Sequence, residues 1–226
     1  MRTKSAAEGV FLRQSWILYP LLFFVALAGW AVASPPGSSP DEDYHLVSAW
    51  CALGTREGFC EPGSSPTTRV VPLDLLRAPC YAFQPTESGN CPADPGETID
   101  TDRGNFVGYY PNGFYTFMGL FASSSLAGSV IVMRLANSLI YAIGLGALFY
   151  LTPVGRRENY MLGSLISSVP LGVFVIASVN PSSWAFTSAT LTWASTVEFL
   201  RTKNKARRLA LGILCAVAIV IGMAAR

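Results

Sequence analysis

Three consecutive carboxylates, Asp41, Glu42 and Asp43, follow closely on the first apolar segment of the chain. Neighbouring carboxylates repel one another and raise each other's pKa, and a nearby bilayer that excludes water adds to this effect. One of them is therefore suited to act as a general base that takes a proton from a hydroxyl. Two of them could instead hold a divalent cation, which is the one cofactor we consider.

A structural interpretation of these acids stands beside the catalytic one. They would then form a solvated turn in which Asp43 caps a helix that starts near Tyr44. The apolar face of that helix would consist of Leu46, Val47 and Trp50.

His45 is the only histidine and would lie one turn into this helix, near the acids. A single histidine is more often a hydrogen-bonded structural residue than a ligand, but here it could support the base or bind metal. Further along, Arg134, Asn137 and Tyr141 share one helix face by their spacing. Arg134 is expected near the outer end of a membrane span. An arginine there faces the bundle interior or a watery cavity, where it could bind a lipid phosphate. The alternative is an arginine that extends to the head groups.

Tyr110 and Asn180 complete the predicted set. Tyr110 lies in a turn that precedes an aromatic segment, and Asn180 precedes Pro181 in what is most simply a tight turn. Asn180 is expected on the same side of the membrane as the acids, where it could help to line a site. The catalytic pair is thus Asp41 and Glu42, and the substrate-binding residues are Asp43, His45, Tyr110, Arg134, Asn137 and Asn180.

The elements that must position these residues are apolar helices. Only 13% of the 226 residues are charged and the mean hydropathy is +0.39, whereas a soluble domain carries about a quarter charged residues. We therefore predict an all-α, polytopic transmembrane bundle of about five spans. The spans are expected at residues 15–34, 130–151, 160–179 with a bend at Pro170, 184–200 and 209–225.

The first apolar run has a second interpretation as a secretory signal peptide, because Ala31-Val32-Ala33 resembles a cleavage site. A retained helix is favoured because the run is long and Pro35-Pro36 follows it directly. Residues 1–14 are then a short tail, 35–110 a large functional loop or a small subdomain held by disulfides, 111–129 an aromatic helix at the membrane interface, and 130–226 four further spans. We expect the chain to be the front part of a larger protein.

Charge sets the expected orientation in the cell membrane. Lys and Arg are concentrated in residues 1–14, 152–159 and 201–208, whereas residues 35–113 hold eleven acidic residues and four Arg. The positive-inside rule then places the N-terminus in the cytoplasm and the 35–110 loop outside. No basic stripe with interleaved aromatics is present, which excludes nucleic acid as the expected partner.

Four of the five cysteines, Cys51, Cys60, Cys80 and Cys91, lie in the 35–110 loop without zinc-type spacing. Disulfides in an oxidising, extracytoplasmic loop explain them better than a metal site. Three pairings are possible, and we favour the local one, Cys51 with Cys60 and Cys80 with Cys91.

Several of these segments resemble a known family. Pro35-Pro36, Asp41-Glu42 and His45, then Tyr110–Tyr115, Arg134-Leu135 and Ser178–Ser183, are similar in order to segments of the domain-of-unknown-function family numbered 2142. That family is grouped with the GT-C membrane glycosyltransferases. The family's members are longer, and the cysteine-bearing insertion between His45 and Tyr109 has no counterpart that we can match.

The resemblance implies an acidic base in the first outer loop, here Asp41 with Glu42 beside it. It also implies a polyprenyl-phosphate sugar as donor and an extracytoplasmic hydroxyl as acceptor, with membrane lipid as the other partner. Arg134, or a metal held by the acids, would offset the phosphate charge. We therefore expect Asp41 and Arg134 to face a common cavity at the outer leaflet. The alternative function is a non-catalytic membrane module whose outer loop binds a partner or a cell-envelope polymer.

Overall fold

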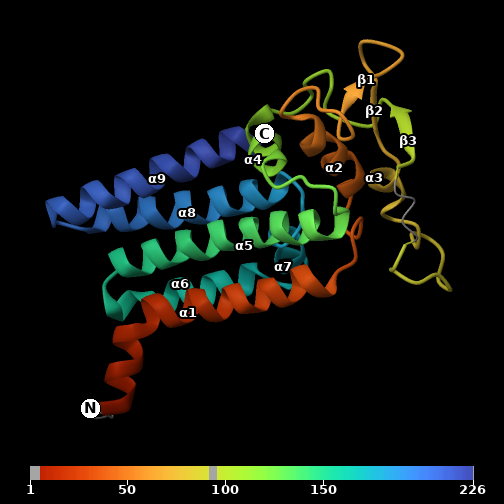
Figure 1. Cartoon of the computed structure of the whole chain (residues 1–226). Coiled ribbons are helices and arrows are strands. Elements are labelled where there is room, and N and C mark those ends of the chain that lie inside the picture. Colours follow the sequence, from red (N-terminus) through yellow and green to blue (C-terminus); the bar gives the residue numbers. More distant parts are fainter. Residues whose placement is uncertain (1–5, 92–95, 226) are drawn as a thin grey trace.

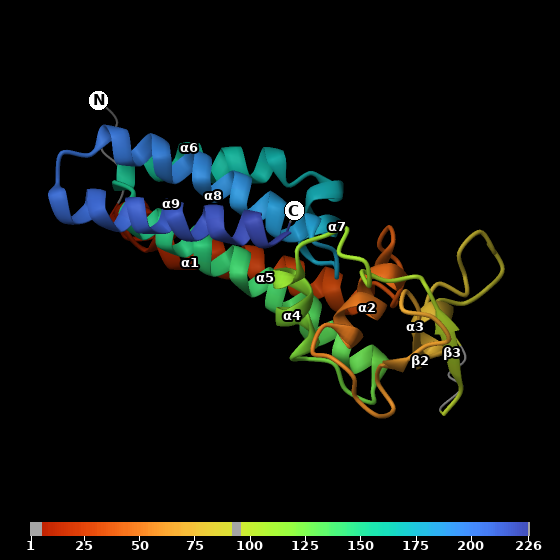
Figure 2. The same ribbon diagram turned by 90° about the horizontal axis from the view of Figure 1, so that it is seen from above.

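The computed structural model describes residues 6–91 and 96–225, with side chains from residue 14 onward. Long helices lie side by side in one elongated bundle, and a cap of short elements covers one end of it (Figures 1 and 2). In the described part of the chain the bundle consists of α1 (Ala6–Ala33), α5 (Leu126–Leu151), α6 (Val154–Ser167), α8 (Ser182–Arg201) and α9 (Lys205–Ala225).

Three of the described helices are long and apolar enough to cross a membrane: Gln14–Ala33 within α1, α5 and α9. A fourth span is possible if α6 and α7 (Pro170–Ile176), which meet at a 90° bend, are taken together. Helix α8 is not apolar enough to count as a candidate span because it is rich in Ser and Thr. Several of these side chains donate to carbonyls of their own helix, as Thr187 does to Ser183. Three or four spans are therefore supported, and the expected five are not confirmed.

The expected bend in the third apolar run is confirmed. Helix α6 ends at Ser167, and Pro170 occupies the first turn of α7. Proline lacks the N–H that would continue the ladder, so the chain starts a new helix in a new direction.

The 35–110 segment folds into most of the cap rather than staying an open loop. Its elements are α2 (Glu42–Cys51), β1 (Glu61–Pro62), β2 (Arg69–Pro72), α3 (Asp74–Arg77) and β3 (Thr98–Thr101). The strands pair antiparallel in the order β1-β2-β3. The favoured disulfide pairing is present, Cys51 with Cys60 and Cys80 with Cys91, so both bridges close short local loops.

Packing joins the cap to the bundle. The expected aromatic helix is α4 (Asn112–Gly119), which is shorter than predicted and packs on α2. Leu46, Val47 and Trp50 of α2 are buried as expected, in one cluster with Phe114 and Met118 of α4. Burial of this apolar face is what fixes α2 on the end of the bundle.

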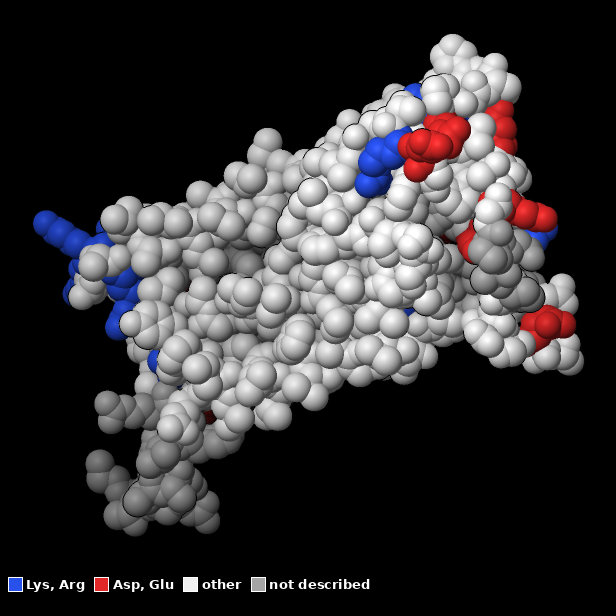
Figure 3. Space-filling view, in the orientation of Figure 1, with Lys and Arg blue, Asp and Glu red and all other residues white. Residues whose placement is uncertain are grey.

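Charged side chains are divided between the two ends. Asp and Glu lie mainly at the cap end, and Lys and Arg lie mainly at the opposite end (Figure 3). The basic end contains the connection between α8 and α9, residues 201–208, with five Lys and Arg. The orientation inferred from this asymmetry remains a prediction.

Candidate functional site

A buried ion pair stands where α1, α2 and α5 meet. Arg134 of α5 donates from Nη2 to Oε2 of Glu42 at 2.7 Å and from Nε to Oε1 at 3.1 Å. The two side chains are 1% and 0% exposed. This bidentate arrangement matches the planar guanidinium fork to the carboxylate, the strongest geometry for such a pair.

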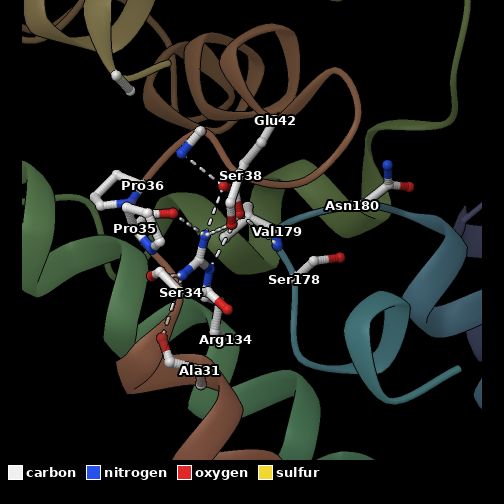
Figure 4. A network of polar contacts seen from close by, with 12 residues as sticks. Ala31, Ser34, Pro35, Pro36, Ser38, Glu42, Arg134, Ser178, Val179 and Asn180 are labelled. Atoms are coloured by element: carbon white, nitrogen blue, oxygen red, sulfur yellow. Dashed lines mark hydrogen bonds and ion pairs between the residues drawn. The ribbon is translucent and has the colours of Figure 1, made fainter. Parts of the chain in front are cut away.

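The remaining donors of Arg134 go to the chain that leaves α1. Nη1 donates to the carbonyls of Ala31 at 3.2 Å and Ser34 at 2.6 Å. Nη2 also donates to the carbonyl of Pro35 at 3.0 Å and to Ser38 Oγ at 3.3 Å (Figure 4). All five guanidinium N–H groups therefore have acceptors within the protein, and the predicted lipid-phosphate contact of Arg134 finds no support in this arrangement.

Glu42 also accepts two backbone hydrogen bonds. Gly37 N donates to Oε2 at 2.8 Å and Val179 N donates to Oε1 at 3.1 Å. Gly37 has φ +76, and a Cβ there would lie 2.7 Å from the backbone of Pro79, so only glycine fits this turn. Glu42 thus joins the end of α1, the start of α2, α5 and the connection before α8 in one network.

Asp41 lies outside this network. It occupies the cap position of α2 in a left-handed conformation, φ 55 and ψ 21, and its side chain forms no capping bond. A non-glycine residue held there carries local strain, of the kind that clusters at functional sites. The carboxylate is 70% exposed and accepts a bond of 3.2 Å from Arg103 Nη2.

The prediction that Asp43 caps α2 was wrong, because the helix starts two residues earlier than expected, at Glu42, and Asp43 lies in its first turn. Its carboxylate pairs with Arg103, through Nε and through Nη2 at 2.9 Å. Burial raises the pKa of Asp43, but the hydrogen bond and charge of Arg103, together with backbone hydrogen bonds from Tyr44 and from Asp43 itself, lower it by more, so the pKa is lowered overall. Asp43 is therefore held as a carboxylate beside Arg103.

An open pocket of about 500 Å³ lies beside Asp41, lined also by Tyr44, His45, Tyr109 and Tyr110. The pocket combines one carboxylate with several aromatic rings at the surface of the cap. Burial, with Tyr110 and Tyr109 nearby, raises the pKa of the Tyr44 hydroxyl, which keeps it protonated and able to donate.

His45 is positioned from behind this pocket by the helix α4. Its Nδ1 shares a hydrogen bond of 2.9 Å with the hydroxyl of Tyr115, and the two rings stack. His45 is 5% exposed, so the hydrogen-bonded structural interpretation describes its surroundings well, while its edge still reaches the pocket.

The other predicted residues position the connection before α8. Asn137 Nδ2 donates to the Ser178 carbonyl at 2.7 Å, and its Oδ1 accepts from Trp184 Nε1 at 3.0 Å. Asn180 Nδ2 donates to the Pro40 carbonyl at 3.1 Å. These contacts hold in place the backbone segment from which the Val179 N–H donates to Glu42.

The expectation that Asp41 and Arg134 face a common cavity was wrong. Arg134 lines a separate cavity of about 330 Å³ together with Pro35 and Pro36, and Asp41 lines the tyrosine pocket. Glu42 separates them, because its side chain turns inward while that of Asp41 turns to solvent.

Comparison with known families gives a clear result. The model of the family DUF2142, described as a predicted membrane protein, matches residues 23–226. The chain belongs to DUF2142. No curated protein and no solved structure matches it.

Four of the segments by which the sequence resembles DUF2142 converge on the buried network. Pro35 supplies a carbonyl, Glu42 the carboxylate, Arg134 the guanidinium and Val179 a backbone N–H. Four motifs that are far apart in the sequence of this DUF2142 member therefore meet at one point of the fold, whereas His45 and Tyr110–Tyr115 lie outside this network.

Sequence reasoning missed three residues of the site in this DUF2142 chain, Arg103, Tyr44 and Tyr109. The acidic segment contains only four basic residues, so their rarity could have indicated that Arg103 pairs with the acids. The described residues contain no group of three or more His, Cys, Asp and Glu side chains that could hold a metal ion.

Proposed function

We propose that this chain is part of a multi-pass glycosyltransferase of the cell membrane, resembling the GT-C enzymes. Its cap faces the outside of the cell and its N-terminus the cytoplasm, as the charge asymmetry predicts. The enzyme transfers a sugar from a polyprenyl-phosphate donor to the hydroxyl of an extracytoplasmic acceptor.

The observation that carries this proposal is that the two acids of the Asp-Glu pair lie in different environments. Glu42 is fully buried and bound by four N–H groups, two from Arg134 and one each from Gly37 and Val179. Asp41 is exposed, strained and placed at the mouth of a pocket. A rigid anchor next to a held, accessible carboxylate is what a general base requires.

The pocket suits a sugar or another polyol. Tyr109 and Tyr110 each combine an apolar ring with a hydroxyl, and Tyr44, whose hydroxyl oxygen is buried, adds its ring. A sugar combines C–H faces with hydroxyl edges. His45 adds a ring nitrogen at the inner wall. We expect Asp43 and Asn180 to act at the rim by holding Arg103 and the Pro40 carbonyl in place.

In the proposed reaction Asp41 accepts the proton of the acceptor hydroxyl. The acceptor oxygen forms a bond to the anomeric carbon of the sugar as the bond from that carbon to the phosphate oxygen breaks. Polyprenyl phosphate leaves with the electron pair, and the configuration inverts. Glu42 and Arg134 act as positioning residues, since they contact Asp41 only through the backbone and through each other.

A non-catalytic module is the second candidate, and one observation favours it. Arg103 already pairs with both Asp41 and Asp43, as in a solvated acidic surface that binds a partner or an envelope polymer. In that case the tyrosine pocket would bind glycan without turnover.

The test uses the full-length protein in membranes with polyprenyl-phosphate glucose and polyprenyl-phosphate mannose as donors, and measures the release of polyprenyl phosphate. Loss of a general base lowers a rate by about 10²–10⁴-fold, so we expect that loss in Asp41→Asn. The control Asp102→Asn, an exposed acid outside the pocket, should keep the wild-type rate. Equal rates for wild type and Asp41→Asn would refute the base, and no release by wild type from either donor would favour the binding module.

A further inference from the structure

A second cavity lies in the bundle, at the end opposite the cap. It is a groove of about 530 Å³ between α6 and α8, with α5 as its floor. We propose that this groove binds an anionic phospholipid of the membrane, with the phosphate at the basic end and one acyl chain along the helices. This site is independent of the proposed glycosyl transfer.

The head of the groove has a net positive charge. Arg156 donates to the buried carboxylate of Glu198 from Nε at 2.9 Å and from Nη2 at 2.6 Å, and Tyr160 donates to it at 2.9 Å. Glu198 is 0% exposed, so Arg156 compensates its charge within the protein. Arg201 also lines the groove and is exposed, and its side chain forms no hydrogen bond or ion pair with the described residues, although its charge acts on Glu198 and Tyr160. Its guanidinium is thus available to a phosphate, which Arg binds bidentately.

The rest of the groove is mostly apolar, although Asn159, Ser164, Ser167 and Thr190 also line it. The hydroxyls of Ser164 and Ser167 donate to carbonyls of their own helix. Beyond the charged head the groove is lined by small and apolar side chains, including Gly163, Ala189, Ala194 and Val197, with the ring of Trp193 at its edge. Trp193 is 75% exposed. From Thr190 to Arg201 the α8 backbone rises about 16 Å at ~1.5 Å per residue. This is about half of a ~30 Å hydrocarbon core, the length of one lipid leaflet.

Charge at this end of the bundle favours an anionic lipid over a neutral one. Five Lys and Arg lie in residues 201–208, and basic side chains gather at this end (Figure 3). Anionic lipid surfaces attract such clusters. The charge alone would act over the whole surface, but the groove gives it one defined place where head and chain are both accommodated.

The first experiment tests the head. The full-length protein is placed in nanodiscs of phosphatidylcholine with added phosphatidylglycerol, and retained lipids are counted by native mass spectrometry. We expect preferential retention of phosphatidylglycerol, weakened about fivefold in Arg201→Gln, the equivalent of about 1 kcal/mol for one basic residue at an anionic surface. The control Lys205→Gln removes the same charge from the same end but does not line the groove, so it should lose much less.

The second experiment tests the position of the acyl chain. A Cβ added at Gly163 meets nothing within 4 Å, so Gly163→Leu places a side chain in the groove without displacing protein atoms. A Cβ at Gly155, on the same helix but outside the groove, also meets nothing within 4 Å, which makes Gly155→Leu the matched control. Brominated phosphatidylglycerol should quench Trp193 fluorescence, measured as the difference from Trp193→Phe. Gly163→Leu should remove most of this quenching, and Gly155→Leu should not.

Three results would overturn the proposal. Equal retention of phosphatidylglycerol and phosphatidylcholine would mean that the groove accommodates another helix or any lipid. Equal loss in Arg201→Gln and Lys205→Gln would reduce the effect to general surface charge. Unchanged quenching in Gly163→Leu would show that the acyl chain lies elsewhere.

Discussion

The ion pair of Glu42 and Arg134 allows a quantitative prediction about what holds the cap on the bundle. In Glu42→Gln the shape is kept, but the charge that balances Arg134 is lost. Both carboxylate oxygens accept backbone N–H groups as well as the guanidinium. Whichever way the new amide is turned, its NH2 faces donors, so a repulsive contact replaces a bond.

The size of the effect follows from burial. Both partners are at most 1% exposed, and removing one member of a buried pair costs about 3–5 kcal/mol because the other charge stays unpaired. For a chain of this length each kcal/mol lowers the melting temperature by about 2–4 °C. Glu42→Gln should therefore melt roughly 6–20 °C below wild type. The measurement is thermal unfolding of the purified protein in detergent, followed by intrinsic fluorescence.

Two comparisons isolate the pair. Glu87→Gln makes the same chemical change at an exposed acid of the cap and should leave the melting temperature unchanged. The double variant Glu42→Gln, Arg134→Gln removes both charges, so its loss of stability should be clearly smaller than the sum of the single losses. A melting temperature for Glu42→Gln close to wild type, or strict additivity in the double variant, would refute a structural role for the pair.

The remaining predictions concern the cap. The Cys51–Cys60 bridge closes a short loop with a sequence separation of 9. Replacing both cysteines by Ala should therefore lower the free energy of unfolding by about 2–3 kcal/mol, measured by thermal unfolding. Cys215 is a free cysteine, so Cys215→Ala serves as the control and should cost much less. The pKa of Asp43 is lowered because the hydrogen bond and charge of Arg103, together with backbone hydrogen bonds, outweigh the effect of burial. Its contribution to stability is therefore complete above the unfolded pKa of about 3.9 and is lost as the pH falls through the lower folded value. Melting temperatures measured from neutral pH down through this window should fall less steeply in Asp43→Asn than in wild type, and parallel curves would contradict the assignment.

Hydropathy and proline were sufficient to predict most of the bundle. The apolar runs that became α1, α5 and α9 are long and nearly uncharged, and such runs have few alternatives to helix in a membrane. The bend at Pro170 follows from the missing N–H. Helix α8 shows the limit of this reasoning, because the helix was predicted at nearly its observed bounds but its many Ser and Thr keep it below the hydropathy of a membrane span.

The cap was harder to predict. Strands β1, β2 and β3 have two to four residues each, which is too short for an alternating pattern to appear. Helix α2 starts two residues earlier than expected, after the left-handed backbone of Asp41, and nothing in the residue type requires that conformation. The local disulfides were predictable in part, because short separations limit which cysteines can meet.

The partner of Arg134 could not be found from spacing, because Glu42 lies 92 positions away. Helix periodicity gave the shared face of Arg134 and Asn137 but not the segment opposite it. What the sequence did contain was an acid and an arginine that each had to leave water, and a buried charge is tolerated only with a partner. Pairing an acid that follows one apolar run with an arginine inside another would have suggested this contact.

The geometry of a helix start explains how one Asp-Glu pair can serve two purposes. Asp41 is the left-handed cap residue before α2 and Glu42 is the first residue of the helix, so their side chains leave the backbone in different directions. Here Glu42 takes the inward position and Asp41, turned further by its left-handed backbone, takes the outward one. The buried acid fixes the position of the exposed one to the end of α1 and to α5, and hence to the membrane. A surface turn that only solvated the cap would not need this anchor, and for that reason the buried partner of Asp41 is the strongest physical argument for a site at this point.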